Sequence, residues 1–303
     1  MPELPEVETV RRGLHNLIIG RIIRYVTVLE SPKSFPNSAD EVDEFLLGGE
    51  ITDVRRRAKV LLIDLSTNYT LVIHLKMMGQ LVFVDKTVED GHIPIAQNGE
   101  LRFGAGHPND SLIGELPDRS TRVILEFTDQ TVLYFNDQRK FGWMRLLPTI
   151  SVPEIDFMKK VGPEPLEDSF TASEFIPRVR RRKNSTIKAT ILDQTVLAGV
   201  GNIYADESLW GAQIHPTSRV VDLSDEQLSK LLIEIKTVML LSIERGGSTD
   251  RNYVNAEGKR GSYIDFAKVF RREGQDCPRC GTTIEKTRVA GRGTHFCPVC
   301  QVQ

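Results

Sequence analysis

Four cysteines lie in the last 27 residues and form two matched pairs, Cys277/Cys280 and Cys297/Cys300. Each Cys-x-x-Cys pair brings two thiolates together from one tight turn, and two such pairs complete the tetrahedron that zinc prefers. Because four thiolates leave no open coordination position, the spacing predicts one structural Zn2+. Disulfides would need a secreted protein, and the chain opens without a secretory signal. A redox dithiol would leave the second pair unexplained.

The segment between the two pairs predicts a β-hairpin over 287–296, with Arg292 in the Gly291-Arg292-Gly293 turn at its tip. An arginine on a rigid, metal-held hairpin is well placed to bind a phosphate. A solvated turn arginine fits the same spacing equally well.

Pro2 is the second candidate for chemistry. Removal of Met1 would make Pro2 a terminal secondary amine, and α-amines titrate near pKa ~8, well below lysine side chains. Such an amine can attack a sugar C1′ carbon and form an iminium, while the adjacent Glu3 carries protons. The same residues also suit an ordinary helix start, so both interpretations stay open on this evidence.

A glycine-bracketed turn, Leu197-Ala-Gly-Val-Gly-Asn202, joins two predicted helices. The turn presents backbone N–H groups, the Asn202 amide and a helix N-terminus, which together can hold a phosphate. A plain interhelical turn is the simpler alternative.

These candidates lie in two parts of the chain that differ in predicted secondary structure. Apolar residues at three- and four-residue steps predict an amphipathic helix over 3–19. Short strand-like runs follow and predict a sandwich; they cover 26–29, 60–65, 70–75, 81–84, 122–127 and 131–135. Residues 85–119 interrupt them and predict a long acidic surface loop. After Pro148 the sequence predicts mainly helices, with candidates at 171–183, 187–197, 203–211 and 224–245.

Composition narrows the class of protein. The 303 residues are 40% hydrophobic and 26% charged, and no apolar run approaches the ~20 residues that cross a bilayer. We therefore expect a cytoplasmic, non-membrane protein of about two domains. The net charge of −2 is uneven, since residues 177–303 carry an excess of six positive charges and residues 1–176 an excess of eight negative ones. This asymmetry favours a polyanion as the partner of the C-terminal half.

Five segments in order resemble the formamidopyrimidine-DNA glycosylases, bacterial repair enzymes for oxidised purines. The opening Pro2-Glu-Leu-Pro-Glu-Val-Glu-Thr-Val-Arg-Arg-Gly-Leu14 is the first of them. The others are Arg55-Arg-Arg-Ala-Lys59, Asn136-Asp-Gln-Arg-Lys-Phe-Gly142, the stretch from Leu192 to Glu207, and the four-cysteine terminus. The resemblance covers nearly the whole chain apart from 85–119.

The resemblance implies roles for individual residues. Pro2 would be the nucleophile, Glu3 the general acid and base, Glu6 its assistant, and Lys59 would face the phosphate and sugar of the lesion. Such enzymes take the damaged base out of the stack. The gap would be filled by Met77, Arg139 and Phe141. The remaining DNA-binding positions would be His74, Lys188, Asn202 and Arg292.

Three positions depart from the family pattern. Lys76 and Ala58 stand where glycine is usual, and Met78 stands where a small or polar residue is common. Lys76 and Met78 leave open which of Met77 and Met78 enters the DNA. The alignment with His74 favours Met77.

The expected fold is α+β. A catalytic helix and β-sandwich would occupy 1–150, a linker 151–170, a helix–two-turn–helix domain 171–265 with a lesion-recognition loop at 246–261, and a four-cysteine zinc-ribbon hairpin 266–303. DNA would lie between the domains, and the protein would be a monomer at the nucleoid.

The expected activity is excision of 8-oxoguanine and formamidopyrimidines from double-stranded DNA, followed by cleavage at the abasic site through β,δ-elimination. Zn2+ would be the one cofactor. The alternatives are the sister glycosylase for oxidised pyrimidines, a non-catalytic zinc-ribbon DNA-binding protein, and a β-elimination lyase that does not excise bases.

Overall fold

The computed structural model describes residues 2–29, 32–86, 100–106, 110–112, 114–248 and 263–302. The chain forms two compact units. The first contains Met1–Lys159 and the segment that begins at Arg245, of which residues 245–248 are described; the second contains Lys160–Glu244 and the chain from Tyr263 onward. The predicted linker thus contains the division, whereas the predicted 246–261 loop begins in the first unit.

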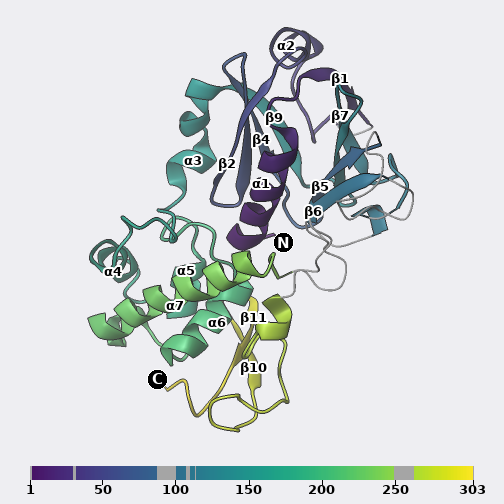
Figure 1. The fold of residues 1–303 in the computed structure, drawn as a ribbon. Coiled ribbons are helices and arrows are strands. Elements are labelled where there is room, and N and C mark those ends of the chain that lie inside the picture. Colours follow the sequence, from purple (N-terminus) through teal and green to yellow (C-terminus); the bar gives the residue numbers. More distant parts are fainter. Residues whose placement is uncertain are drawn as a thin grey trace. The chain divides into compact units, whose positions relative to one another are not determined.

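Helix α1 (Leu4–Ile18) opens the first unit (Figure 1). Its apolar face is fully buried through Val7, Val10 and Leu14, as the three- and four-residue spacing predicts. Gly13 lets the helix approach strand β6 closely, because a Cβ at this position would lie 2.1 Å from the ring of Phe103. The packing of α1 places the N-terminal end of the chain at a defined position on the unit.

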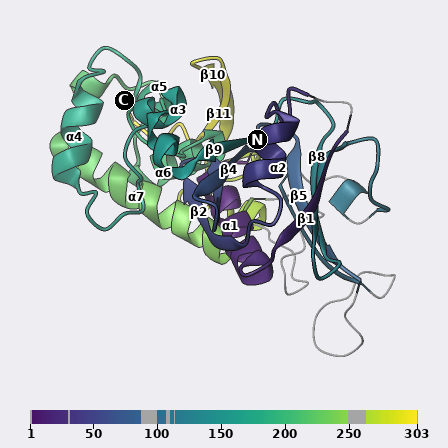
Figure 2. The same ribbon diagram turned by 90° about the horizontal axis from the view of Figure 1, so that it is seen from above.

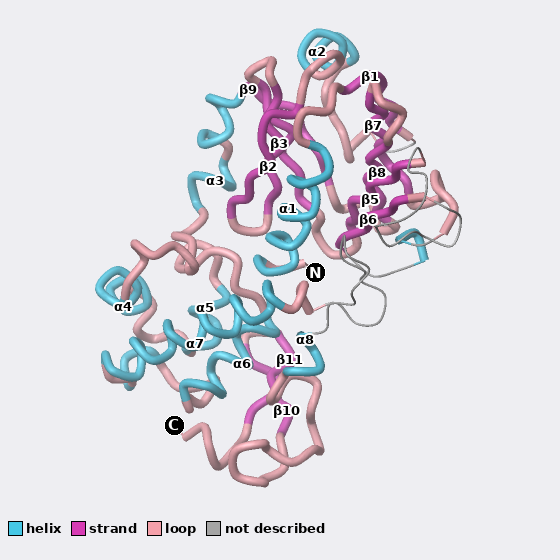
Figure 3. The backbone as a smooth tube through the Cα atoms, in the orientation of Figure 1, coloured by secondary structure: helices cyan, strands magenta, loops and turns pink. Residues whose placement is uncertain are grey.

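Two antiparallel sheets make up most of the first unit (Figure 2 and Figure 3). The five-stranded sheet has the order β1-β7-β8-β5-β6, with β1 (Ile23–Val28), β5 (Gly79–Asp85), β6 (Leu101–Gly106), β7 (Thr121–Phe127) and β8 (Val132–Asp137). The four-stranded sheet has the order β2-β3-β4-β9, with β2 (Ile51–Arg57), β3 (Val60–Leu65), β4 (Tyr69–His74) and β9 (Trp143–Pro148).

One apolar core joins the two sheets and α1 into the expected sandwich. Alternate strand residues such as Leu61, Ile63, Leu81 and Phe83 belong to this core. Their neighbours face the opposite side and form a second cluster on each sheet. On the four-stranded sheet that cluster includes Val60, Leu62 and Val152, so both faces are covered and the strand sequence is continuously apolar.

The prediction of a loop over the whole of 85–119 is wrong in part, because β6 lies within it and pairs with β5. A 3-10 turn, η1 (Asp110–Leu112), follows β6. Between β5 and β6, residues 87–99 of the predicted loop lie outside the described residues. The short helices α2 (Ala39–Phe45) and α3 (Asp156–Lys160) and the 3-10 turn η2 (Thr149–Glu154) were not predicted either.

The second unit is helical with a small hairpin. Its helices are α4 (Ala172–Arg180), α5 (Ile187–Leu192), α6 (Asn202–Ala212), α7 (Asp225–Glu244) and α8 (Tyr263–Phe266), with the 3-10 turn η3 (Val220–Asp222). A hydrogen bond of 2.7 Å between Tyr204 and Ser242 joins α6 to α7. The hairpin consists of β10 (Glu285–Val289) and β11 (Arg292–Phe296). Among the described helices, none has the length and apolar character needed to cross a membrane.

Candidate functional site

Pro2 directly precedes the first turn of α1, and both are buried. Glu3 is the N-cap residue, and it shares a reciprocal capping box with Glu6: each side chain accepts the backbone N–H of the other residue, with 2.8 Å between Glu3 N and Glu6 Oε2. The positive end of the helix dipole favours both carboxylates. The capping box therefore fixes Glu3 beside Pro2, as the proposed acid–base role requires.

The second carboxylate oxygen of Glu6 binds another part of the first unit. It accepts the backbone N–H of Ser248 at 2.8 Å. Gly247 adopts φ +96°, and a Cβ there would lie 3.3 Å from Glu6 Cγ. Glu6 thus holds the start of the predicted lesion-recognition loop beside the N-terminus, whereas residues 249–261 of that loop lie outside the described residues.

Lys59 follows the left-handed residue Ala58 (φ 52°) at the turn between β2 and β3 and is only 6% exposed. Arg56 supports this turn, because its Nη1 donates to the Ala58 carbonyl at 3.0 Å and its Nε pairs with Glu8 Oε2 at 3.1 Å. Burial opposes ionisation of Glu8, yet hydrogen bonds from neighbouring arginines hold its pKa below the ordinary value. An ion pair with α1 therefore braces the strand turn that carries Lys59.

His74 ends β4 and is nearly buried. Burial, together with the positive charges of Lys76 and Lys59, lowers the pKa of His74 from 6.5 to about 3. Its Nδ1 accepts the backbone N–H of Lys76 at 3.0 Å, which places the proton of the neutral ring on Nε2. The ring lies 5.9 Å from that of Trp143. His74 is thus a neutral hydrogen-bond donor, suited to one phosphate oxygen.

Met77, Arg139 and Phe141 come together at one exposed tip of the first unit. Met77 is 45% exposed and Phe141 is 54% exposed, unusual values for large apolar side chains. Arg139 lies between them, with its Nη1 3.6 Å from the Met77 sulfur and its guanidinium carbon 4.8 Å from the Phe141 ring centroid. Met78 is only partly exposed, so Met77 presents the more exposed thioether of the two at this tip.

Asp137 holds the loop that carries Arg139 and Phe141, a role that the sequence analysis missed. Its carboxylate is fully buried and accepts three backbone N–H groups, those of Arg139 at 2.9 Å, Phe141 at 2.8 Å and Gly142 at 2.5 Å. An aspartate two residues before a turn commonly binds such N–H groups, so the Asn-Asp-Gln-Arg segment contained the signal.

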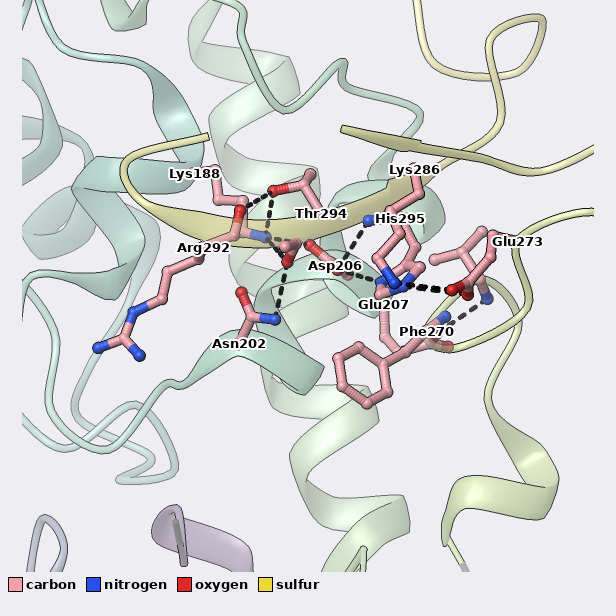
Figure 4. Close-up of polar contacts among 12 residues, drawn as sticks. Lys188, Asn202, Asp206, Glu207, Phe270, Glu273, Lys286, Arg292, Thr294 and His295 are labelled. Atoms are coloured by element: carbon pink, nitrogen blue, oxygen red, sulfur yellow. Dashed lines mark hydrogen bonds and ion pairs between the residues drawn. The ribbon is translucent and has the colours of Figure 1, made fainter. Parts of the chain in front are cut away.

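The second unit brings Lys188, Asn202 and Arg292 to the start of α6 and the hairpin tip (Figure 4). Asn202 Nδ2 donates to the Gly293 carbonyl at 2.9 Å, and Arg292 is exposed on the same hairpin. Lys188, by contrast, has no exposed surface and is ion-paired with Asp206 at 2.6 Å. Direct DNA contact by Lys188 is incompatible with this burial, so we replace the predicted contact with a supporting role.

The glycine-bracketed turn before α6 is held by Gln194, which was not predicted. Gln194 Oε1 accepts the N–H of Gly199 at 2.9 Å, and its Nε2 donates to the Val200 carbonyl at 2.8 Å. Gly201 is the N-cap residue of α6 and supplies no side-chain hydrogen bond to the first turn. The first N–H groups of this 11-residue helix can therefore bind an anion, as the sequence analysis predicted.

The four cysteines form a cluster whose sulfur atoms all lie within 4.8 Å of one another. Cys277 and Cys300 are 3.9 Å apart, and Cys280 and Cys297 are 3.5 Å apart. Sulfur atoms at the corners of a tetrahedron around zinc would be ~3.8 Å apart, given Zn–S bonds of ~2.3 Å. The donor set and its geometry therefore suit one structural Zn2+.

Helix α6 also supports this metal site through Trp210. The indole Nε1 donates to the Cys277 sulfur at 3.4 Å, and the guanidinium of Arg279 lies 4.0 Å from the centroid of the indole ring. A hydrogen bond to a ligating sulfur orients the ligand and stabilises its charge.

A β-sandwich led by helix α1, a helical unit and a four-cysteine hairpin together define the class of protein. Family models match three consecutive parts of the chain: the formamidopyrimidine-DNA glycosylase N-terminal domain at 1–144, the H2TH domain of the same family at 161–253, and a zinc finger found in FPG and IleRS at 274–302. The chain belongs to the formamidopyrimidine-DNA glycosylase family.

Full-length relatives and solved structures agree with this assignment. The chain is 42% identical to the formamidopyrimidine-DNA glycosylase of Pediococcus pentosaceus, covering 100% of this chain and 99% of that protein. It is 40% identical to the one from Listeria innocua over 99% of this chain and 100% of that protein. The complex of a Lactococcus lactis FPG variant with Fapy-dG DNA is 32% identical with a TM-score of 0.82 and full coverage of both chains. The Thermus thermophilus MutM protein gives 35% identity and 0.78, covering 99% and 98% of the two chains.

Proposed function

We propose that this chain excises oxidised purines from double-stranded DNA and then cleaves the strand at the resulting abasic site, with Pro2 as the nucleophile. The observation that carries the proposal is the N-terminus of α1. There a capping box fixes the buried carboxylates of Glu3 and Glu6 beside Pro2, in a member of the formamidopyrimidine-DNA glycosylase family. The similar Lactococcus lactis structure contains Fapy-dG DNA, and a second one, 32% identical with a TM-score of 0.82 over 99% of this chain and 100% of that chain, contains abasic-site DNA; these are the substrate and intermediate of this reaction.

The reaction begins when the secondary amine of Pro2, freed by removal of Met1, attacks C1′ of the damaged nucleotide. The N–C1′ bond forms as the glycosidic bond breaks, and the departing base takes up a proton. The Glu3 carboxylate takes the proton from the Pro2 nitrogen, now bonded to C1′, and passes it to the sugar ring oxygen, so the ring opens and an iminium forms. Loss of a C2′ proton expels the 3′ phosphate, and a second elimination expels the 5′ phosphate.

Charged and neutral donors around the N-terminus hold the DNA in this scheme. Lys59 supplies a positive charge for the phosphate beside the lesion, and neutral His74 donates one hydrogen bond from Nε2. Once the base leaves the stack, Met77 and Phe141 fill the space, and the Arg139 guanidinium bonds the unpaired base.

The second unit binds the phosphate backbone away from the reacting sugar. Arg292 and the first turn of α6 with Asn202 supply the donors, and the excess positive charge of residues 177–303 strengthens them. The Zn2+ supplies no reacting group, and its ligands Cys277, Cys280, Cys297 and Cys300 make the hairpin rigid. The chain acts as a monomer, in the cytoplasm with the nucleoid, where its DNA substrate lies.

Borohydride trapping tests the nucleophile. Reduction during reaction with a duplex that contains 8-oxoguanine opposite cytosine should fix the protein to DNA, and peptide mass mapping should place the link at Pro2. The Pro2→Gly variant should lose most base excision while still binding DNA. Pro5→Ala is the matched control, since its nitrogen lies inside the chain.

Each other outcome selects an alternative. Trapping only on a duplex with an oxidised pyrimidine would indicate the sister glycosylase. Trapping only on a preformed abasic site would indicate a lyase without base excision. Tight DNA binding with no trapping on any duplex would leave a non-catalytic binding protein and refute the proposed mechanism.

A further inference from the structure

Helix α6 carries a buried carboxylate, Asp206, that the proposed reaction does not use. Asp206 is 1% exposed, and its Oδ1 lies 2.6 Å from the ammonium nitrogen of the fully buried Lys188. Its Oδ2 accepts the backbone N–H of His295 at 2.9 Å and lies 3.2 Å from His295 Nδ1. One carboxylate therefore binds a side chain of α5 and the backbone of β11 at the same time (Figure 4).

Lys188 extends this link to the hairpin tip. Its ammonium group donates to the Thr294 hydroxyl at 2.7 Å and to the Gly293 carbonyl at 3.1 Å. The ion pair with Asp206 adds to these two hydrogen bonds. The Gly293 carbonyl also accepts from Asn202, and the Thr294 hydroxyl donates to the Arg292 carbonyl at 3.0 Å. The peptide groups on the C-terminal side of Arg292 are thus fixed from α5 and α6.

Asp206 is not the only residue that holds the zinc-binding segment (residues 266–303) against the helices of the second unit. The neighbouring Glu207 accepts the backbone N–H groups of Lys268, Val269 and Phe270 at 2.7–2.9 Å, where the chain enters this segment. Trp210 binds Cys277 from the end of the same helix. A buried ion pair is also weak evidence for stability, since apolar residues of similar volume often replace one without loss.

We infer that Asp206 is a positioning residue for phosphate binding, which orients Arg292 and Asn202 on one backbone phosphate through Lys188 and β11. Figure 4 shows the Arg292 guanidinium directed away from the buried cluster, on the side of Asn202. No described residue forms an ion pair with that guanidinium, so it is available for a phosphate oxygen. The inference rests on the proposed role of Arg292 in DNA binding.

The test measures the salt dependence of DNA affinity for Asp206→Asn and Arg292→Ala. The ligand is a duplex with a tetrahydrofuran abasic-site analogue. Each variant should bind about tenfold more weakly at ~0.1 M salt, and the slope of log Kd against log salt should fall by about one phosphate contact. The double variant should bind no more weakly than Arg292→Ala.

Glu207→Gln is the matched control, one residue away and equally buried. It should lower the melting temperature and leave the salt slope unchanged, because it holds the entry of the zinc-binding segment and not its tip. If Asp206→Asn does not fold, the double variant Lys188→Met/Asp206→Leu removes both buried charges together. That protein should fold and show the same reduced slope.

Two results would overturn the inference while leaving the phosphate role of Arg292 in place. One is an unchanged slope of log Kd against log salt in Asp206→Asn while Arg292→Ala shows the reduced slope. That result would leave the proposed function intact. The other is additive loss of affinity in the double variant, which would show that Asp206 does not act through Arg292. Normal binding by Arg292→Ala would refute its phosphate role and the inference with it.

Discussion

Single carboxylates fix the backbone around the proposed DNA-binding and reacting groups at separate places. Glu6 binds the N–H groups of Glu3 and Ser248, and Asp137 binds three N–H groups at the tip that carries Arg139. Hydrogen bonds to an ionised acceptor are roughly twice as strong as neutral ones. These carboxylates therefore hold loops in geometries that the loop sequences would not adopt alone.

Replacement of Asp137 by asparagine tests this role. The amide retains one acceptor, but its NH2 group would face backbone donors, so the free energy of unfolding should fall by about 3 kcal/mol. Urea denaturation measures the change. The exposed Asp222→Asn should cost less than ~1 kcal/mol. A similarly small cost at Asp137 would contradict the positioning role.

His74 predicts a dependence of stability on pH. Its pKa is about 3 in the folded protein and 6.5 in the unfolded chain, so the unfolded chain binds more protons between these values. The neutral ring's stabilising contribution is complete above about pH 6.5 and is lost progressively as the pH falls toward 3. His74→Gln should therefore lose less stability than wild type between about pH 7 and pH 5. Equal slopes for wild type and His74→Gln would exclude His74 as the cause.

At the scale of the secondary-structure elements, two turns between strands contain two of the three departures from the family pattern. At Ala58 and Lys76 the family resemblance leads us to expect glycine, and both residues adopt positive φ, 52° and 51°. Glycine enters this left-handed region without steric cost, whereas other residues pay ~1 kcal/mol or more. Each of these two turns therefore carries a backbone cost that glycine would not have.

A comparison of two substitutions at Lys76 isolates this backbone cost. Lys76→Gly should be more stable than Lys76→Ala by about 1 kcal/mol, because both lack the lysine side chain and only glycine tolerates the φ value. At the exposed Thr237 inside α7 the order should reverse, since glycine weakens a helix interior. Thermal or urea unfolding of the four variants gives the result; the same order at both positions would argue against strain at Lys76.

Elements with strong periodicity could be predicted from the sequence. Elements whose structure depends on contacts with residues distant in the sequence were missed. Spacing and apolar runs indicate helix α1 and strands β3 and β4 directly. Strand β6 was missed because its glycines and flanking turn residues resemble a loop, although Phe103 packs on Gly13. The candidate site was predicted through motifs, but the exclusion of Lys188 from direct contact depends on its burial by Asp206, a partner 18 positions away that no local pattern identifies.

In the molecule as a whole, each of the two units has its own means of stability. The first relies on one large apolar core between its sheets and α1. The second has buried apolar residues in its helices, such as Phe175 and Leu231, and a separate small cluster that includes the metal-ligand candidates Cys277, Cys297 and Cys300. Structural zinc contributes directly to the folding free energy of small domains.

Removal of zinc should therefore affect the units unequally. A chelator should release one Zn2+ per chain, lower the melting temperature of the second unit and weaken DNA binding, while the first unit keeps its transition. Calorimetry with metal analysis measures both effects, and Cys297→Ser should reproduce the chelated state. Restored zinc should reverse the change in wild type alone. Loss of both transitions together would show that the units are not independent.

The two tryptophans of the chain provide a spectroscopic probe for each unit. Trp143 lies beside the His74 ring, and Trp210 donates to the Cys277 sulfur. Thiolates and imidazoles both quench indole fluorescence, so the emission of each tryptophan reports on its own neighbour. With Trp143→Phe, the remaining signal follows metal loading at the hairpin; with Trp210→Phe, it follows events at His74. The two single-tryptophan variants therefore permit stopped-flow measurements on either unit without an attached dye.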